Sequence, residues 1–317
     1  MSKTIGLTAG IALSGLHATG WASCGAAFCS VNTDWTVQDV WTTPGWRLDV
    51  RLEYIDQDEP RAGSDKVSVG ALPRHHDEVS TQNLNVITTA DYNFGNDWGL
   101  SLRVPVVSRD HEHIHHHHGA ALRETWDFTR VGDVAVLGQY QLIGNPLRGR
   151  SGGLRFGLEL PTGRFTVTNS EGAAAERSLQ PGSGTTDLLL GGYYQMGLPG
   201  GQGTWFAQGM WKYALNERKH YRPGNHVALD FGVNYPLQPS LTGMLQVNLQ
   251  YKGTDRGDAA EPDDSGSRTV ALSPGLAYEV GSFGRVYGFV QVPVYQHVDG
   301  IQLTADWSVA LGWTRAF

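Results

Sequence analysis

Cysteine and charged residues are scarce in this sequence, and long hydrophobic runs are missing from most of it. Only 2 of its 317 residues are cysteine, and only 17% are charged. The formal net charge of -7 provides no basic surface for nucleic acid. Beyond the N-terminus, no apolar run reaches the roughly 18 residues that a membrane-spanning helix needs. A helical membrane protein is therefore excluded. A membrane β-barrel is not, because its strands alternate apolar and polar residues.

Glycine and the large aromatic residues are abundant. The chain contains 41 Gly, about twice the ordinary usage, together with 10 Trp and 12 Tyr. Such a mixture suits many strands, many turns and aromatic side chains at a membrane interface, and it does not suit a helical enzyme. The length allows one large all-β domain or two smaller ones.

The N-terminus has the pattern of a secretory signal peptide. Lys3 precedes an apolar run over 5–16, which is too short to span a bilayer, and small residues follow it. Cleavage after Gly20 or Ala22 is expected, so we assign residues 1–22 to the signal peptide. Export places the remainder of the chain in an oxidising compartment.

Residues 23–45 are interpreted as a periplasmic N-terminal segment, and they contain both cysteines. Cys24 and Cys29 are close enough in sequence to form a small disulfide loop. Two alternatives stay open: a copper or zinc site that uses both thiols, and lipidation of Cys24. Trp21 stands where a lipoprotein signal would have a small aliphatic residue, which argues against lipidation.

From residue 46 the chain alternates with period two. Over 46–55, one face carries Trp46, Leu48, Val50, Leu52 and Tyr54, and the other carries Arg47, Asp49, Arg51 and Glu53. Four charges on one face cannot pack into a dry core. They can line the wet interior of a barrel whose opposite face meets lipid. The charges expected to face the lumen are Arg47, Asp49, Arg51, Glu53, Asp91, Arg103, Asp133, Glu159, Lys212, Asp230, Glu279 and Asp306.

Twelve strands follow from this pattern, an even number, as single-chain bacterial barrels require. They are expected at 46–55, 81–93, 97–107, 131–143, 152–161, 184–196, 203–214, 225–236, 240–252, 268–280, 284–295 and 301–317. The turns between them alternate between short and long, with long loops at 56–80, 108–130, 162–183, 215–224 and 253–267. The last connection, at 297–300, is short. We therefore predict an all-β, transmembrane, antiparallel up-and-down barrel over 46–317, with both ends in the periplasm.

The C-terminal strand supports this assignment. Trp307, Val309, Leu311, Trp313 and Phe317 lie on one face and end in a terminal aromatic residue. This ending resembles the signal that the barrel assembly machinery reads. It indicates that this machinery and the lipid of the bacterial outer membrane are partners of the chain.

Several segments resemble the outer-membrane barrel family named for the meta-pathway of phenol degradation, whose members are often labelled transporters. The matching segments are Leu160-Pro161-Thr162-Gly163, Gly182-Ser183-Gly184-Thr185-Thr186-Asp187, Leu272-Ser273-Pro274-Gly275-Leu276 and Val292-Pro293-Val294 through Asp306-Trp307. The resemblance covers about 45–317. It implies a barrel and the passage of small solutes, and it implies no catalytic residue.

Histidines gather in the segments expected to form the outer loops, and none is expected in the middle of a strand. Imidazoles beside carboxylates at a barrel mouth suit Zn²⁺, Cu²⁺ or Ni²⁺. A solvated polar loop that binds metal incidentally is the alternative. The candidate ligands are His75, His76, Asp77, Glu78, His111, His113, His115, His116, His117 and His118.

These features predict a channel or transporter for small solutes. Whether its role involves a metal bound by the His-rich loops is left open by the sequence. The protein is not expected to be an enzyme, to require a cofactor or to bind nucleic acid. A non-conducting barrel that binds metal or a surface partner is the first alternative. An outer-membrane hydrolase is the second, and it would need a base within reach of a serine nucleophile.

Overall fold

The computed structural model describes residues 31, 44–71, 76–117, 120–145, 150–200 and 202–317. The predicted signal peptide (1–22) and the predicted Cys24–Cys29 disulfide lie outside these residues. Val31 belongs to the predicted N-terminal segment, and it lies inside the barrel against Ile55, Ala305 and Ala310. Within the described part of the chain, no helix is long and apolar enough to cross a membrane.

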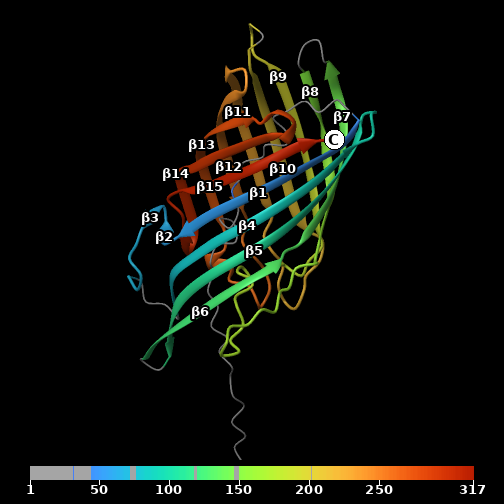
Figure 1. Cartoon of the computed structure of the whole chain (residues 1–317). Coiled ribbons are helices and arrows are strands. Elements are labelled where there is room, and N and C mark those ends of the chain that lie inside the picture. Colours follow the sequence, from blue (N-terminus) through green and yellow to red (C-terminus); the bar gives the residue numbers. More distant parts are fainter. Residues whose placement is uncertain (1–30, 32–43, 72–75, 118–119, 146–149, 201) are drawn as a thin grey trace, which may run out of the picture.

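Twelve antiparallel strands form a closed barrel, and each pairs with its neighbour in sequence around the ring (Figure 1). Pairing of the first strand with the last closes the ring. The strands are β1 (Gly45–Gln57), β4 (His76–Asn93), β5 (Trp98–His117), β7 (Val134–Asn145), β8 (Arg150–Leu160), β9 (Asp187–Gly197), β10 (Thr204–Ala214), β11 (His226–Gln238), β12 (Leu241–Lys252), β13 (Ser267–Glu279), β14 (Arg285–Thr304) and β15 (Ser308–Ala316). The predicted up-and-down barrel is thereby confirmed.

Three further strands extend the wall at the long-loop end. β6 (Ala120–Val131) pairs with the outer half of β5. The hairpin of β2 (Glu59–Gly63) and β3 (Asp65–Lys66) pairs with the outer end of β14. Figure 1 shows the β5–β6 hairpin reaching past the barrel at its lower end. Two short 3-10 helices, η3 (Pro262–Asp264) and η4 (Gly281–Phe283), lie in connections.

Two predicted connections are wrong, and a third, the loop predicted at 56–80, contains the β2–β3 hairpin and the beginning of β4. The segment 108–130 was expected to be a loop, but most of it is the β5–β6 hairpin, because alternation of buried and exposed residues continues past Val107 through Arg109, His111 and His113. The last connection was expected at 297–300. That segment remains in β14, where an irregular register between Val298 and Ile301 accommodates Gly300 at a φ of 61°. The chain turns at 305–307 instead.

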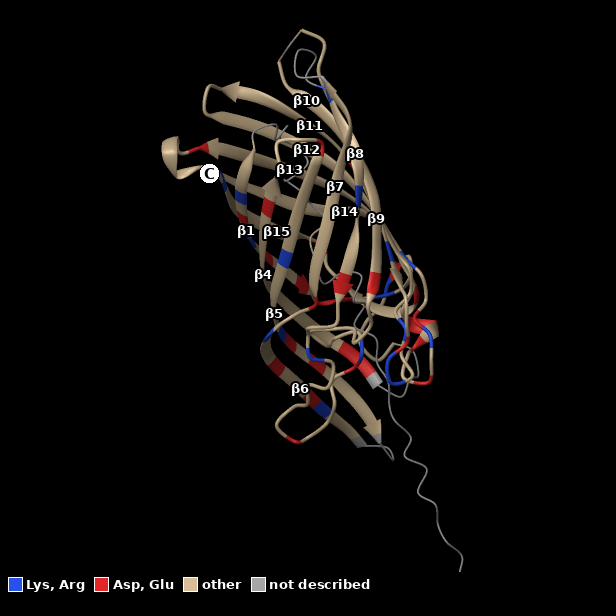
Figure 2. Cartoon of the chain, turned by 90° about the vertical axis from the view of Figure 1, so that its right-hand side faces the viewer, with Lys and Arg blue, Asp and Glu red and all other residues tan. Residues whose placement is uncertain are grey.

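The outer face of the barrel is an apolar belt with aromatic residues at both ends. Leu84, Leu158, Phe231, Leu245 and Leu272 are among its exposed side chains. At the short-turn end, Trp46 packs against Tyr92 and Trp98 against Tyr140; at the other end, Tyr54 contacts Trp307 and Trp211 contacts Tyr213. Charged residues gather at the long-loop end (Figure 2). An apolar band between two aromatic girdles is the surface of an outer-membrane barrel.

The middle of this belt should not tolerate a charge. Phe231 points outward near the middle of β11 and is 46% exposed. The substitution Phe231→Arg should lower the free energy of unfolding in phospholipid vesicles by roughly 2–4 kcal/mol, because it places a guanidinium in hydrocarbon. Urea titration followed by tryptophan fluorescence measures the change. On the same strand face near the membrane interface, Leu237→Arg should cost at most about 1 kcal/mol. Equal costs at both positions would contradict the assignment of the belt.

Candidate functional site

A cavity of about 320 Å³ occupies the interior of the barrel, and charged side chains line it. Strands β1, β4, β5 and β7 through β12 contribute to its wall. Eight of the charges predicted to face the lumen line this cavity: Asp49, Arg51, Asp91, Arg103, Asp133, Glu159, Lys212 and Asp230. Arg155 lines it as well and was missed, although it shares the alternation of Glu159 on β8. The period-two pattern therefore identified most of the polar interior.

Two of the predicted lumen charges lie elsewhere. Asp306 is in the turn after β14, where its carboxylate accepts a hydrogen bond from Lys66 at 2.7 Å. Glu279 ends β13 and pairs with Arg285 at the start of β14. Both residues stand at strand ends, where the alternation of faces no longer determines the direction of a side chain.

The carboxylates of the cavity all have partners in the wall. Arg47 pairs with Asp91 at 2.9 Å, the Tyr287 hydroxyl donates to Asp49, and Gln208 donates to Asp230 at 2.7 Å. Arg103 differs from these residues. Its side chain is exposed to the cavity, and it makes no hydrogen bond or ion pair with the described residues. Tyr287 and Gln208 are neutral donors, so they do not neutralise the charges of Asp49 and Asp230.

An aromatic cluster fills the barrel beside the cavity. Tyr287 and Phe289 on β14 point inward and are buried with Met244 and Ala277. The Phe289 ring lies over Gly275, where a Cβ atom would come within 2.4 Å of it. Gly275 belongs to the segment Leu272-Ser273-Pro274-Gly275-Leu276. A glycine is required there because the ring occupies the space of any larger side chain. The cluster therefore narrows the interior of the barrel beside the cavity.

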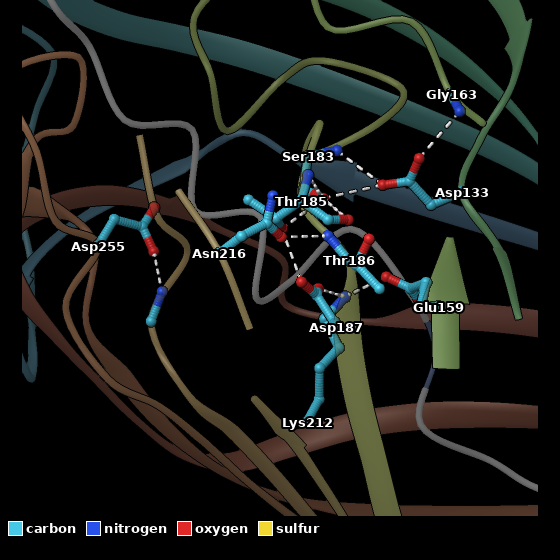
Figure 3. A network of polar contacts seen from close by, with 11 residues as sticks. Asp133, Glu159, Gly163, Ser183, Thr185, Thr186, Asp187, Lys212, Asn216 and Asp255 are labelled. Carbon is cyan, nitrogen blue, oxygen red and sulfur yellow. Dashed lines mark hydrogen bonds and ion pairs between the residues drawn. The ribbon is translucent and has the colours of Figure 1, made fainter. Parts of the chain in front are cut away.

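The two loop segments that resemble the phenol meta-pathway family meet at the rim of the barrel (Figure 3). The Asp133 carboxylate accepts hydrogen bonds from the Gly163 amide at 2.9 Å and from the Ser183 amide at 2.7 Å. Burial raises the pKa of the Asp133 carboxyl, and these N–H donors limit the rise. Gly163 and Gly182 pack backbone to backbone, so a Cβ atom on either would clash. Asp133 thus fixes both ends of the long loop 161–186.

An ion-pair triad lies next to the contacts of Asp133 with Gly163 and Ser183. The Lys212 ammonium is 2.5 Å from Glu159 and 3.4 Å from Asp187, whose side chain is fully buried. Thr185 donates its hydroxyl hydrogen to Asp187 at 2.6 Å. Three neighbouring strands, β8, β9 and β10, are joined by these contacts where they leave the membrane. The segment from Gly182 to Asp187 therefore supports the wall and the loop together.

The predicted metal ligands are only partly brought together. His111 and His113 are buried on one face of β5, and Glu78 of β4 is buried beside them. His116 pairs with Asp77 at 2.7 Å on the opposite face. His75 and His118 lie outside the described residues, and the side chains of His76 and His117 are not described. The prediction that no histidine lies in the middle of a strand is wrong, because β5 continues through His111 and His113.

Two carboxylates at this cluster were missed. Glu124 of β6 is 3.1 Å from His113 Nε2, and Glu176 of the loop 161–186 is 3.5 Å from His113 Nδ1. The sequence predicts a loop over 108–130, and a loop gives no register that would place Glu124 of β6 beside His113. Glu176 is more than sixty positions from His113, and only folding of the loop onto the sheet brings them together. Trp126, Phe128, Val167 and Leu179 form the apolar core of that contact.

A serine–histidine contact also occurs at the outer rim. Ser64 Oγ is 3.1 Å from His297 Nδ1. A hydrolytic triad would need an acidic group to orient the imidazole. Within the part of the chain that the structure describes, no carboxylate lies within ion-pair distance of His297. The contact is therefore a hydrogen bond between a turn and β14, not an assembled triad.

Comparison with solved structures supports the fold. An outer-membrane channel from Pseudomonas putida F1 superposes with a TM-score of 0.66 at 13% identity, over 90% of this chain and 99% of that chain. The transport unit of the autotransporter AIDA-I from Escherichia coli reaches 0.49 at 10% identity, over 90% and 93%. No curated protein matches the sequence significantly. At this identity, the likeness to the Pseudomonas channel supports the barrel fold alone.

Comparison with protein families is more specific. A single family model matches residues 116–303, which is more than half of the chain. The match includes the rim segments around Gly163 and Ser183 and the β13 segment around Gly275. The chain therefore belongs to the family described as "Putative MetA-pathway of phenol degradation".

Proposed function

We propose that this protein is a channel for small solutes in the bacterial outer membrane, and that Arg103 in its lumen binds anionic groups of these solutes. The single observation that carries the proposal is the lined cavity. Charged residues from many strands converge on an interior volume inside a wall that faces lipid. A structural barrel without transport could fill this space with apolar side chains at lower cost, because buried charges are expensive.

The role of Arg103 follows from its place in the cavity. Asp91 pairs with Arg47, whereas the Arg103 guanidinium lines the cavity without a partner among the described residues. An unpaired guanidinium in a narrow lumen with low-dielectric walls attracts anionic groups that pass close to it. Small organic solutes that carry a carboxylate are the class that this residue would contact.

Planar-bilayer recordings test the proposal. The purified full-length protein should produce discrete conductance steps, and the reversal potential in a KCl gradient gives its chloride-to-potassium permeability ratio. Substitution of Arg103 with glutamine should lower the chloride-to-potassium permeability ratio by at least about twofold. Lys66→Gln serves as the matched control, because Lys66 lies outside the lumen and pairs with Glu59 and Asp306. Absence of conductance, together with absence of solute uptake into liposomes, would refute the proposal.

The channel proposal also accounts for features that the alternatives leave unexplained. A hydrolase would need an acid beside His297, and the described residues supply none. A purely surface-binding barrel gives no reason for a charged cavity in the lumen. We further expect the C-terminal strand, which ends in an exposed Phe317, to be recognised by the barrel assembly machinery. Deletion of Phe317 should reduce the amount of folded barrel in the outer membrane.

A further inference from the structure

The outer extension of the barrel places four potential metal ligands on one buried surface. Three strands run side by side there, with β5 between β4 and β6. His111 and His113 are two residues apart, so their side chains leave the same face of β5. Glu78 lies opposite His113 on β4, and Glu176 reaches the same face from the loop 161–186. His111 is fully buried and His113 is 6% exposed.

In each of the two imidazoles, one ring nitrogen contacts an oxygen of a neighbouring side chain, and the second nitrogen is left as the candidate metal ligand. His111 Nδ1 is 2.8 Å from the Thr81 hydroxyl, and His113 Nε2 is 3.1 Å from the Glu124 carboxylate. An N–H that donates to these oxygens leaves the lone pairs on His111 Nε2 and His113 Nδ1. These two atoms face one another across 3.5 Å. Histidines that bind metal commonly donate their second N–H to a carboxylate or another oxygen in this way.

The spacing of three of the four atoms is close to that of a tetrahedral site, and the fourth ligand, Glu78, lies beside His111. His113 Nδ1 is 3.5 Å from Glu176 Oε1, and His111 Nε2 is 3.7 Å from Glu78 Oε2. The ligand atoms of His111, His113 and Glu176 all lie within 4.8 Å of one another. Zinc bonds to nitrogen and oxygen of about 2.0–2.1 Å place neighbouring ligand atoms of a tetrahedron roughly 3.3–3.4 Å apart. Small shifts of His111, His113 and Glu176 would seat the ion, and the Glu78 carboxylate would move toward it to complete the shell.

We propose that this extension binds one Zn²⁺ ion through His111 Nε2, His113 Nδ1, Glu176 and Glu78. Two neutral imidazoles and two carboxylates form a neutral complex with a divalent cation, which lowers the cost of keeping two carboxylates in a buried site. The ion would also join the loop 161–186 to the strands β4 and β5. This site is independent of conduction, because its ligands are absent from the lining of the lumen cavity.

A second group of ligands adjoins the first. His115 and Glu124 surround His113 Nε2 and could hold an ion on the other edge of the same ring. That group is more exposed, and Glu124 is already the hydrogen-bond partner of His113 Nε2. Adventitious binding by the run from His115 to His118 is a further source of metal affinity, as in any chain with consecutive histidines. Variants can separate these sources from the proposed site.

The test uses the full-length protein in detergent after treatment with EDTA. Zn²⁺ titration by calorimetry, together with metal analysis after dialysis, should give one tightly bound ion per barrel. Co²⁺ in its place should develop the intense visible absorption of a tetrahedral complex. The substitutions His111→Ala and Glu176→Gln should each weaken Zn²⁺ binding by at least about 100-fold. Glu124→Ala should weaken it by roughly 10–100-fold, because it removes the hydrogen-bond acceptor of His113 Nε2.

The matched control removes the neighbouring histidine run. A variant with His115, His116, His117 and His118 all replaced by asparagine should bind Zn²⁺ within about threefold of the unmodified protein, since none of these residues belongs to the proposed shell. Heat-dependent gel migration confirms that each variant is folded. Loss of the tight site in this control, or its persistence in both His111→Ala and Glu176→Gln, would overturn the proposal. Absence of stoichiometric binding in the unmodified protein would do the same.

Discussion

Replacing Lys212 with methionine should lower the free energy of unfolding by about 3 kcal/mol. Lys212 neutralises Glu159 at 2.5 Å and the fully buried Asp187 at 3.4 Å. Without the ammonium, two carboxylates face one another in a poorly solvated site, and removal of one partner from a buried pair costs roughly 3–5 kcal/mol. The lower end of this range of costs applies because the Lys212 side chain is 30% exposed. Urea unfolding in phospholipid vesicles, followed by tryptophan fluorescence, measures the loss.

A second substitution distinguishes charge from shape in this triad. In the Lys212→Met background, the change Asp187→Asn removes the buried charge and should recover at least about half of the lost stability. The amide keeps the size of the carboxylate and can still accept the hydrogen bond from Thr185. If the double variant is no more stable than Lys212→Met alone, packing of the lysine stem rather than charge would explain the loss.

Replacing Trp126 with alanine should release the loop 161–186 from the β5–β6 hairpin. Trp126 is 2% exposed and packs with Val167, Ala175 and Leu179, and its indole N–H donates to the Ala173 carbonyl at 3.0 Å. Loss of a buried tryptophan costs roughly 3–5 kcal/mol. The open population of the loop should therefore rise by at least about two orders of magnitude. Trypsin cleavage after Arg164 and Arg177, or hydrogen exchange of the loop amides, reports this change.

The control for this prediction keeps the ring and removes the hydrogen bond. Trp126→Phe should cost only about 1 kcal/mol locally, which corresponds to a roughly fivefold rise in cleavage. Both variants are assayed in EDTA, so that metal binding at the adjacent histidines does not contribute. The barrel itself should remain folded in both, since Trp126 lies on the extension and not in the closed ring. Unchanged cleavage in Trp126→Ala would show that other contacts hold the loop.

The strands of the barrel were predictable because each one faces two different solvents. Lipid on one side and a wet lumen on the other force alternation, as in β1, where Asp49, Arg51 and Glu53 are buried inside while Leu52 is exposed outside. This constraint is local and repeats at every second residue. It also explains why eight lumen-facing charges were identified correctly, whereas Glu279 and Asp306, at strand ends, were not.

The outer extension escaped prediction because its sequence is polar on both faces. His111 and His113 face inward and His116 faces outward, so hydropathy does not mark β5 as a strand beyond Val107. The identity of the loop contacts depends on long-range packing. Glu176 meets His113 only because Leu179 and Val167 bury the Trp126 ring. No spacing in the sequence reports a contact of this kind.

The amino-acid sequence by itself determined the barrel, the number of strands in its ring, the face of each strand that meets lipid and the membrane in which it resides. The reason is that alternate residues must face lipid and a wet lumen, and only a closed membrane barrel satisfies both sides. The tertiary structure alone decided how the rim segments join at Asp133 and Lys212, which lumen charge stays free, and which carboxylates complete the histidine cluster. Those features depend on residues from different strands and loops, whose distances are set only when the ring closes and the long loop folds onto its extension.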